Sequence, residues 1–273
     1  MMFKNLKSKL NRLPIFYKLK FKLLLSDISE EEINKIDYNQ YNNNKSIPKI
    51  YHDCNYKIFT ESDSLYTDYE KVIKIACWLR NNTIGGPGLG FHSTKTLDMM
   101  IYVTNCVCSD FAQVFNYFCV INDIQVREWG LNNVFFNDNG HSINEVYCKE
   151  LKKWILIDVS RSILFYKSDK NKPLSVLETF HLSVKEINKN YFSFNDSYEL
   201  NDKDYKVIKH FFYNKNFRPF LIDRYRNNVY DFFLKKLHFL PIPFVHGLIL
   251  LLGLSYKLRL VAIPLKQINE EYL

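Results

Sequence analysis

The chain has 273 residues with a hydrophobic content of 47%, which suffices to bury a core and excludes a disordered protein. Lys and Arg outnumber Asp and Glu by 37 to 29, and the formal net charge is +8. The basic residues are scattered, and no recognition helix, aromatic RNA-binding motif or zinc finger accompanies them. We therefore expect no nucleic-acid partner. Six cysteines without a secretory signal peptide favour free thiols and a cytoplasmic location.

The first 60 residues have a mixed pattern. An apolar and basic start is followed by "SDISEEEINKI", in which Ser26 or Ser29 can cap a helix whose first turn carries three glutamates. A polar loop, "DYNQYNNNKS", comes next. We expect residues 1–60 to form a helical extension.

Two helices are predicted in the middle of the chain. Residues 62–82 carry apolar side chains near helical spacing, and "IGGPGLG" at 84–90 breaks the pattern. A second helix is predicted to begin at Cys108, because Phe111, Val114 and Phe118 fall at i, i+3 and i+7. Cys106 precedes this helix.

After the second helix the period changes from helical to alternating. Residues 124–130, 141–148 and 154–160 are predicted strands, with turns at 137–140 and 149–153. This order of elements predicts an α+β core in which helices pack on an antiparallel sheet.

Beyond about residue 200 the chain is rich in aromatic residues, and we expect residues 201–273 to be a helical extension. Its segment 239–256 contains no Lys, Arg, Asp or Glu, but Pro241 and Pro243 leave the helical part too short to cross a bilayer. A buried or interface helix is the favoured interpretation. Peripheral contact with a membrane or a complex through residues 239–265 is the alternative.

One cysteine, one histidine and one aspartate are the candidate catalytic residues. Cys108 at a helix N-terminus meets unpaired N–H groups and the positive end of the helix dipole, which favour a thiolate. His141 opens the second strand, and an antiparallel hairpin would bring it close to Asp158 or Ser160. Taken singly, each residue also has an ordinary structural role: a core cysteine, a surface histidine and a turn-capping aspartate.

Metal binding is the competing interpretation of the cysteines. Cys106, Cys108, His141 and Cys148 could supply four zinc ligands, but structural zinc sites favour two or more residues between paired cysteines, and only one separates these. The acidic and amide residues show no EF-hand order. We expect neither a metal nor a cofactor.

Three stretches carry a family resemblance: "VCSDFAQVFNYFCVINDIQVREWG", "GHSINEVY" and "KKWILIDVS". Together they resemble the core of the transglutaminase-like superfamily, which has a papain-like fold, over about residues 65–165. The resemblance implies Cys108 as the nucleophile, His141 as the general base and acid, and Asp158 as the residue that orients His141. It also implies a catalytic core within residues 61–200.

The expected activity is acyl transfer or hydrolysis of a protein or peptide amide through a thioester on Cys108. The Cys108 backbone N–H would supply part of the oxyanion hole, and Trp78 and Asn81 are the candidates for a second donor. The alternative is a catalytically silent scaffold or binding module of the same fold, docked on a membrane or a complex.

Overall fold

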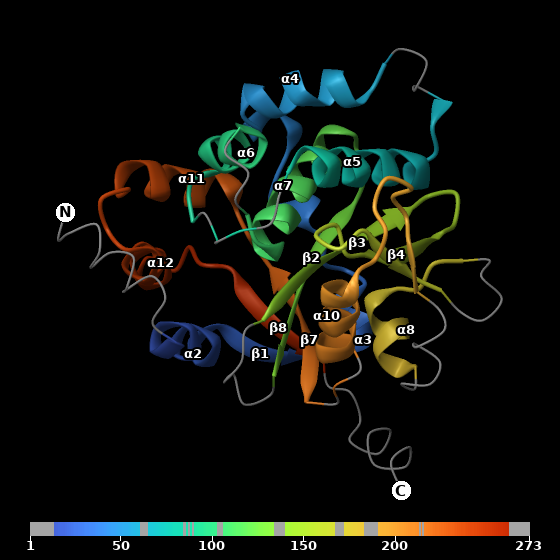
Figure 1. Cartoon of the computed structure of the whole chain (residues 1–273). Coiled ribbons are helices and arrows are strands. Elements are labelled where there is room, and N and C mark those ends of the chain that lie inside the picture. Colours follow the sequence, from blue (N-terminus) through green and yellow to red (C-terminus); the bar gives the residue numbers. More distant parts are fainter. Residues whose placement is uncertain are drawn as a thin grey trace, which may run out of the picture.

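The computed structural model describes residues 14–60, 65–83, 86, 88, 90–102, 106–133, 140–166, 172–182, 191–212, 214 and 216–261 (Figure 1). Most of the predicted turn at 137–140, about half of the breaker at 84–90 and the last residues of the segment 239–265 lie outside these ranges. A mixed sheet occupies the centre, and helices cover both of its faces (Figure 1).

Six strands form the main sheet in the order β1-β8-β7-β2-β3-β4. Their bounds are Leu25–Ile28 for β1, Val126–Asn133 for β2, His141–Cys148 for β3, Lys153–Ile157 for β4, Phe217–Asp223 for β7 and Lys257–Val261 for β8. The predicted hairpins β2–β3 and β3–β4 are antiparallel. The edge pair β1–β8 is parallel, so the expectation of an entirely antiparallel sheet was wrong at that edge.

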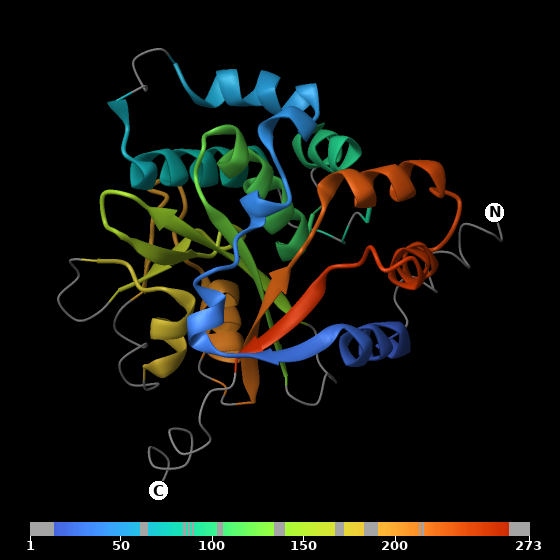
Figure 2. The same cartoon turned by 180° about the vertical axis from the view of Figure 1, so that it is seen from behind.

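Strands from distant parts of the chain share this sheet. β7 lies between β2 and β8, and β1 lies beyond β8 (Figure 2). The helical extensions predicted at either end therefore also contain strands, which corrects that prediction. Pro219 within β7 explains why the strand was missed, since a proline inside a run argues against a strand. The division at residues 60 and 200 stays a prediction.

The predicted nucleophile helix, α7, spans Cys108–Ile121, with Cys108 as its first residue. Helix α5, Asp68–Asn82, begins later than predicted because Thr67 caps it and its N–H donates to Glu70. The helices α4 (Lys49–Ile58) and α6 (Ser93–Tyr102) complete this layer on one face of the sheet.

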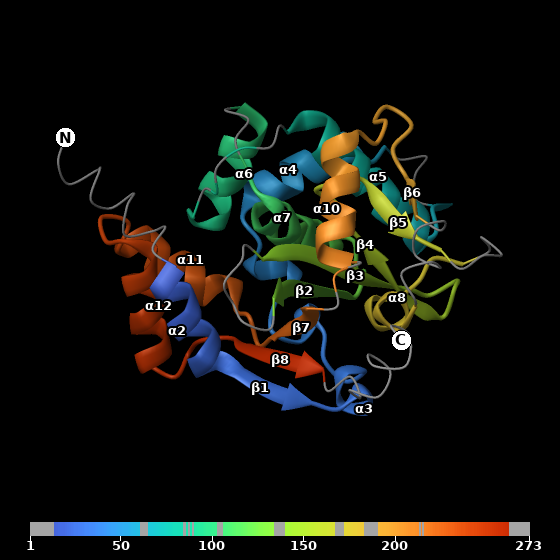
Figure 3. The ribbon, with the colours of Figure 1, turned by 60° about the horizontal axis from the view of Figure 1, so that its bottom comes forward.

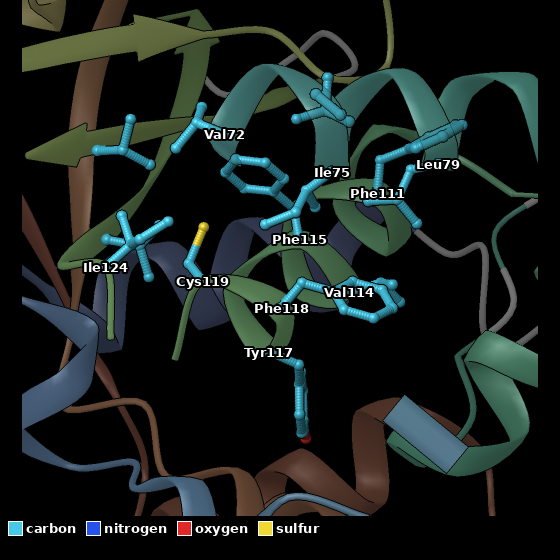
Figure 4. Packing of buried hydrophobic residues seen from close by; sticks show 14 of the residues in the cluster. Val72, Ile75, Leu79, Phe111, Val114, Phe115, Tyr117, Phe118, Cys119 and Ile124 are labelled. Carbon is cyan, nitrogen blue, oxygen red and sulfur yellow. The ribbon is translucent and has the colours of Figure 1, made fainter. Parts of the chain in front are cut away.

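A dense apolar core fixes α7 between these helices and the sheet. Val72, Ile75 and Leu79 of α5 are fully buried and pack with Phe115 and Phe118 of α7 (Figure 4). Almost the whole length of α7 is buried, which its apolar sequence requires. Packing on all sides holds the N-terminus of α7, and hence Cys108, in one position over β2 and β3.

The opposite face of the sheet carries a second core, to which α8 (Val176–His181) and α10 (Asp202–Phe212) contribute. A two-stranded sheet of β5 (Ile163–Phe165) and β6 (Tyr191–Ser193) continues from β4. Short turns precede α4: α3 at Glu30–Ile33 and 3-10 turns at Tyr38–Gln40 and Asn44–Ser46. Ser29, one of the two predicted caps, starts α3.

A third core lies at the β7–β8 side of the sheet, where α2 (Pro14–Leu24), α11 (Asn227–Lys236) and α12 (Ile242–Leu251) meet (Figure 3). Helix α12 is the helical part of the uncharged segment found in the sequence. Within the described ranges, no helix has both the length and the apolar character needed to cross a membrane.

Candidate active site

Three elements bring the predicted residues together. Cys108 opens α7, His141 opens β3, and Asp158 directly follows β4. Asn144 pairs with Ile157 in the β3–β4 hairpin, which places Asp158 opposite Ile143 and diagonally across from His141. Because diagonal neighbours two residues apart share one face of a sheet, the side chains of His141 and Asp158 meet. The hairpin arrangement expected from the sequence is confirmed.

The histidine and the aspartate form a buried pair. Nε2 of His141 lies 2.6 Å from Oδ2 of Asp158, and their side chains are 4% and 1% exposed. The other carboxylate oxygen, Oδ1, accepts hydrogen bonds from Ser160 Oγ at 2.8 Å and from the Arg161 N–H at 3.2 Å. Burial alone would raise the pKa of Asp158, but the charge of His141 and these hydrogen bonds lower it.

The cysteine completes the chain of contacts. The Cys108 thiol lies beside His141 and the backbone N–H of Ser142, and both lower its pKa. Since Nε2 of His141 faces Asp158, Nδ1 is the ring nitrogen left for Cys108. Burial alone would raise the pKa of Cys108. The interaction with His141 has the larger effect, so the pKa of Cys108 is lowered.

The neighbouring charges that lower the pKa of Cys108 have their counterpart at His141, whose pKa is raised. Burial lowers the pKa of His141, but the negative charges of Asp158 and Cys108 raise it to about 10. A lowered thiol pKa and a raised imidazole pKa together favour a thiolate facing an imidazolium at neutral pH. Such a pair is the reactive form of a nucleophilic cysteine.

The pKa of each of the other five cysteines is raised, and all five lie in the described ranges. Burial raises the pKa of Cys106 to about 12 and that of Cys77 to about 11. It also raises the pKa of Cys54, Cys119 and Cys148. Cys108 is thus the one cysteine of the six whose pKa is lowered, and Cys106 is a packed neighbour in the core.

An aromatic ring that the sequence did not indicate covers the histidine. Phe211 of α10 stacks on the His141 ring, with centroids 4.9 Å apart and planes 20° apart. Arg161, next to the Asp158 turn, holds α10 through a 3.1 Å ion pair with Asp204. The spacing of apolar residues in α10 could have predicted a buried face, but no local signal specifies that this face would meet His141.

A buried polar cluster lies under α7. The Glu128 carboxylate of β2 accepts hydrogen bonds from Gln113 and Asn116 of α7, the latter at 3.0 Å. Asn144 of β3 donates to the Ala112 carbonyl at 3.1 Å and to Asn116 Oδ1 at 2.8 Å. Burial, opposed by these hydrogen bonds, raises the pKa of Glu128 to about 8. Polar residues inside the apolar run of α7 were the sequence signal for this cluster.

The two side chains proposed as oxyanion donors have other contacts. Trp78 packs edge-on against Phe118, with ring centroids 5.8 Å apart. Asn81 accepts a 2.8 Å hydrogen bond from Asn195. Both assignments stay predictions. The Cys108 N–H lies in the first turn of α7, where backbone donors lack partners within the helix.

The zinc alternative fails on geometry. His141 and Cys148 stand at opposite ends of β3, and seven steps along a strand separate their Cα atoms by about 24 Å. One ion cannot bind both. In the part of the chain that the structure describes, no group of three or more His, Cys, Asp or Glu side chains could hold a metal ion.

No family model and no curated protein matches the sequence. Among solved structures, the chain is similar to a candidate cysteine protease from Cytophaga hutchinsonii, with 22% identity and a TM-score of 0.33. The match covers 46% of this chain and 48% of that chain. A likeness at this level decides neither fold nor activity, so the chemistry has to be inferred from the arrangement of Cys108, His141 and Asp158.

Proposed function

We propose that this protein is a cysteine enzyme with a papain-like, transglutaminase-like core that transfers or hydrolyses the acyl group of a protein or peptide amide. The observation that carries the proposal is the buried His141–Asp158 pair, with the Cys108 thiol beside it at the N-terminus of α7. Each link has the direction that nucleophilic catalysis requires: a thiolate, an imidazolium and a buried carboxylate that orients it.

In the first half-reaction, the Cys108 thiolate attacks the amide carbonyl carbon and forms a C–S bond. The carbonyl oxygen becomes an oxyanion, which the Cys108 N–H in the first turn of α7 is placed to stabilise. The C–N bond then breaks as His141 donates its proton to the leaving amine. The products of this step are a free amine, a neutral His141 and a thioester on Cys108.

In the second half-reaction, neutral His141 accepts a proton from the incoming nucleophile, which attacks the thioester carbon. Breaking the C–S bond returns Cys108 as the thiolate and His141 as the imidazolium. Water as the acceptor gives hydrolysis, and a primary amine gives a new amide. The same three residues serve both outcomes.

The deciding experiment measures the alkylation rate of all six cysteines against pH, with iodoacetamide labelling and peptide mass spectrometry. We expect Cys108 to react fast below neutral pH and to lose this reactivity in His141→Ala. Cys77 is the internal control, because it is also partly exposed and burial raises its pKa. An ordinary thiol at Cys108 in both proteins would identify a catalytically silent scaffold instead.

Turnover is tested with casein and a fluorescent primary amine, while newly formed amino termini and released ammonia report hydrolysis. We expect Cys108→Ala to abolish whichever signal the wild type gives, by about 10⁴-fold or more. Unchanged turnover in this variant would refute the proposal.

A further inference from the structure

Three helices gather at the β7–β8 side of the sheet, away from the chemistry of α7 and β3. Figures 2 and 3 both show α2, α11 and α12 grouped there. The Phe16 and Phe244 rings join α2 to α12, with centroids 5.8 Å apart. Lys20 Nζ lies 3.1 Å from His246 Nδ1 and above the Tyr256 ring. Lys20 is therefore occupied within the protein, and α2 is firmly attached to α12.

Helix α2 has an apolar face that nothing in the described chain covers. Leu24 points into the third core, whereas Ile15, Leu19 and Leu23 are 67%, 53% and 59% exposed. These three residues are spaced four apart, so they form one stripe along the outer side of the helix.

Helix α12 repeats this arrangement. Val245 and Ile249 are buried in the third core. On the outer side, exposed apolar residues continue through the end of the helix: Phe244, Leu248, Leu251 and Leu252. Leu251 is 86% exposed. A helix that is apolar on its outer side as well as its inner side is typical of one that contacts a second apolar phase.

The exposed apolar side chains are concentrated on this part of the molecule. With Phe232 of α11 and Phe239 before α12, the three helices and their connection carry nine of the sixteen large apolar side chains exposed in the described ranges. Single exposed leucines are ordinary on a protein surface, but a group on adjacent helices marks an interaction site.

Positive charge surrounds these apolar stripes. Lys18 and Lys22 on α2, and Lys235 and Lys236 at the end of α11, are exposed. Residues 14–24 and 227–257 contain six lysines and a single acidic residue, Asp231. That carboxylate is engaged by the backbone N–H and hydroxyl of Ser93. The surface is thus apolar with a cationic rim.

We propose that the outer faces of α2 and α12 dock on an anionic lipid surface. The leucines and phenylalanines would enter the boundary of headgroups and acyl chains, while the lysines reach back to the anionic headgroups. A second copy of the chain fits less well, because a two-fold contact would place the same lysines opposite one another without acidic partners.

Vesicle flotation with the full chain tests this proposal, which does not depend on the proposed acyl-transfer activity. We expect the protein to float with vesicles of phosphatidylcholine plus phosphatidylglycerol and to stay behind with phosphatidylcholine alone. The double variant Leu19→Asp, Leu251→Asp should lower the partition coefficient about tenfold or more. Leu65→Asp is the matched control, since Leu65 is 90% exposed and lies outside these helices.

Two further measurements separate lipid binding from other causes. Lys18→Glu with Lys22→Glu should also abolish flotation, and added salt should weaken it in the wild type. Circular dichroism and the Cys108 alkylation rate should stay unchanged in every variant, so a failed active site would not be confused with failed docking. Flotation equal in the wild type and the Leu19, Leu251 variant would overturn the proposal. So would an absence of flotation, or a dimer in light scattering that this variant dissolves.

Discussion

Polar and apolar side chains are distributed in opposite ways at the two halves of the main sheet. On the β2–β3–β4 side, charged and amide groups are buried beside α7, and each contact of His141, Asp158 and Glu128 is made within the protein. On the β1–β8–β7 side, leucines and phenylalanines of α2 and α12 face outward. Both arrangements are unfavourable for stability alone. Both proposed sites thus lie where the usual distribution of polar and apolar residues is reversed.

The largest expected effect comes from Asp158→Asn, which keeps the shape of the side chain but removes the charge facing His141. We expect the rate of acyl transfer to fall about 10²- to 10⁴-fold, because an imidazolium is no longer favoured. The alkylation midpoint of Cys108 should rise toward that of an ordinary thiol. An unchanged midpoint would show that Asp158 does not support the ion pair.

The pH dependence of stability tests the same pair. The pKa of folded His141, about 10, lies above its ordinary value of 6.5. The bound proton therefore stabilises the fold fully below about pH 6.5, and this contribution is lost as the pH rises to about 10. In urea unfolding, Asp158→Asn should lower the free energy of unfolding more near pH 6 than near pH 10. An equal penalty at both would contradict the raised pKa.

Next in size is the loss of the ring over His141. Phe211→Ala should lower the free energy of unfolding by about 3 kcal/mol and slow Cys108 alkylation, since the imidazole loses its stacking partner. Phe212→Ala is the matched control, because its ring packs on Phe165 instead, with centroids 4.6 Å apart. We expect a similar loss of stability from this variant without the change in alkylation. If both variants changed the Cys108 alkylation rate equally, Phe211 would contribute to stability only and would not position His141.

A smaller effect is expected from Glu128→Gln, which retains an oxygen to accept the hydrogen bonds of Gln113 and Asn116. The folded pKa of Glu128, about 8, exceeds its ordinary value of 4.5. Between these values the unfolded chain has released the proton and the folded chain has kept it, so wild-type stability falls as pH rises. Relative to the wild type, the variant should gain stability from about pH 5 to about pH 8 in urea unfolding. A constant difference would argue against a buried neutral carboxyl.

The smallest effect on folding is expected on the opposite side of the molecule. Leu251→Asp should change the free energy of unfolding by less than about 0.5 kcal/mol, because a side chain that is 86% exposed leaves no cavity when replaced. Thermal or urea unfolding without vesicles measures it. A loss of several kcal/mol would mean that Leu251 is covered within the protein.

The sequence predicted those parts of the fold that depend on local periodicity. Helix α7 and the strands β3 and β4 have strong 3.6- and 2-residue patterns, and their boundaries agree closely with the predicted ones, except that β4 ends at Ile157 and not at residue 160. The closeness of His141 and Asp158 followed from the predicted hairpin, whereas Cys108 was assigned from its place at a helix N-terminus and from the family resemblance. Their catalytic roles stay predictions.

What could not be predicted depends on contacts between distant segments. The pairing of β7 with β2 and of β1 with β8 has no local signature, and Pro219 argued against the former. Phe211 and Glu128 also gain their meaning from neighbours far away in sequence. Periodicity indicates that such residues are buried but not what they touch.

The central place of β7 in the sheet has a consequence for the order of biosynthesis. The cysteine, the histidine and the aspartate all leave the ribosome before Phe211 and β7, which follow them in the chain. The edge strand β1 can pair only after β8 has been synthesised, more than two hundred residues downstream. Such non-local pairing makes folding slow. We therefore expect the surroundings of Cys108, His141 and Asp158 to be completed only after α10 and β7 have been synthesised.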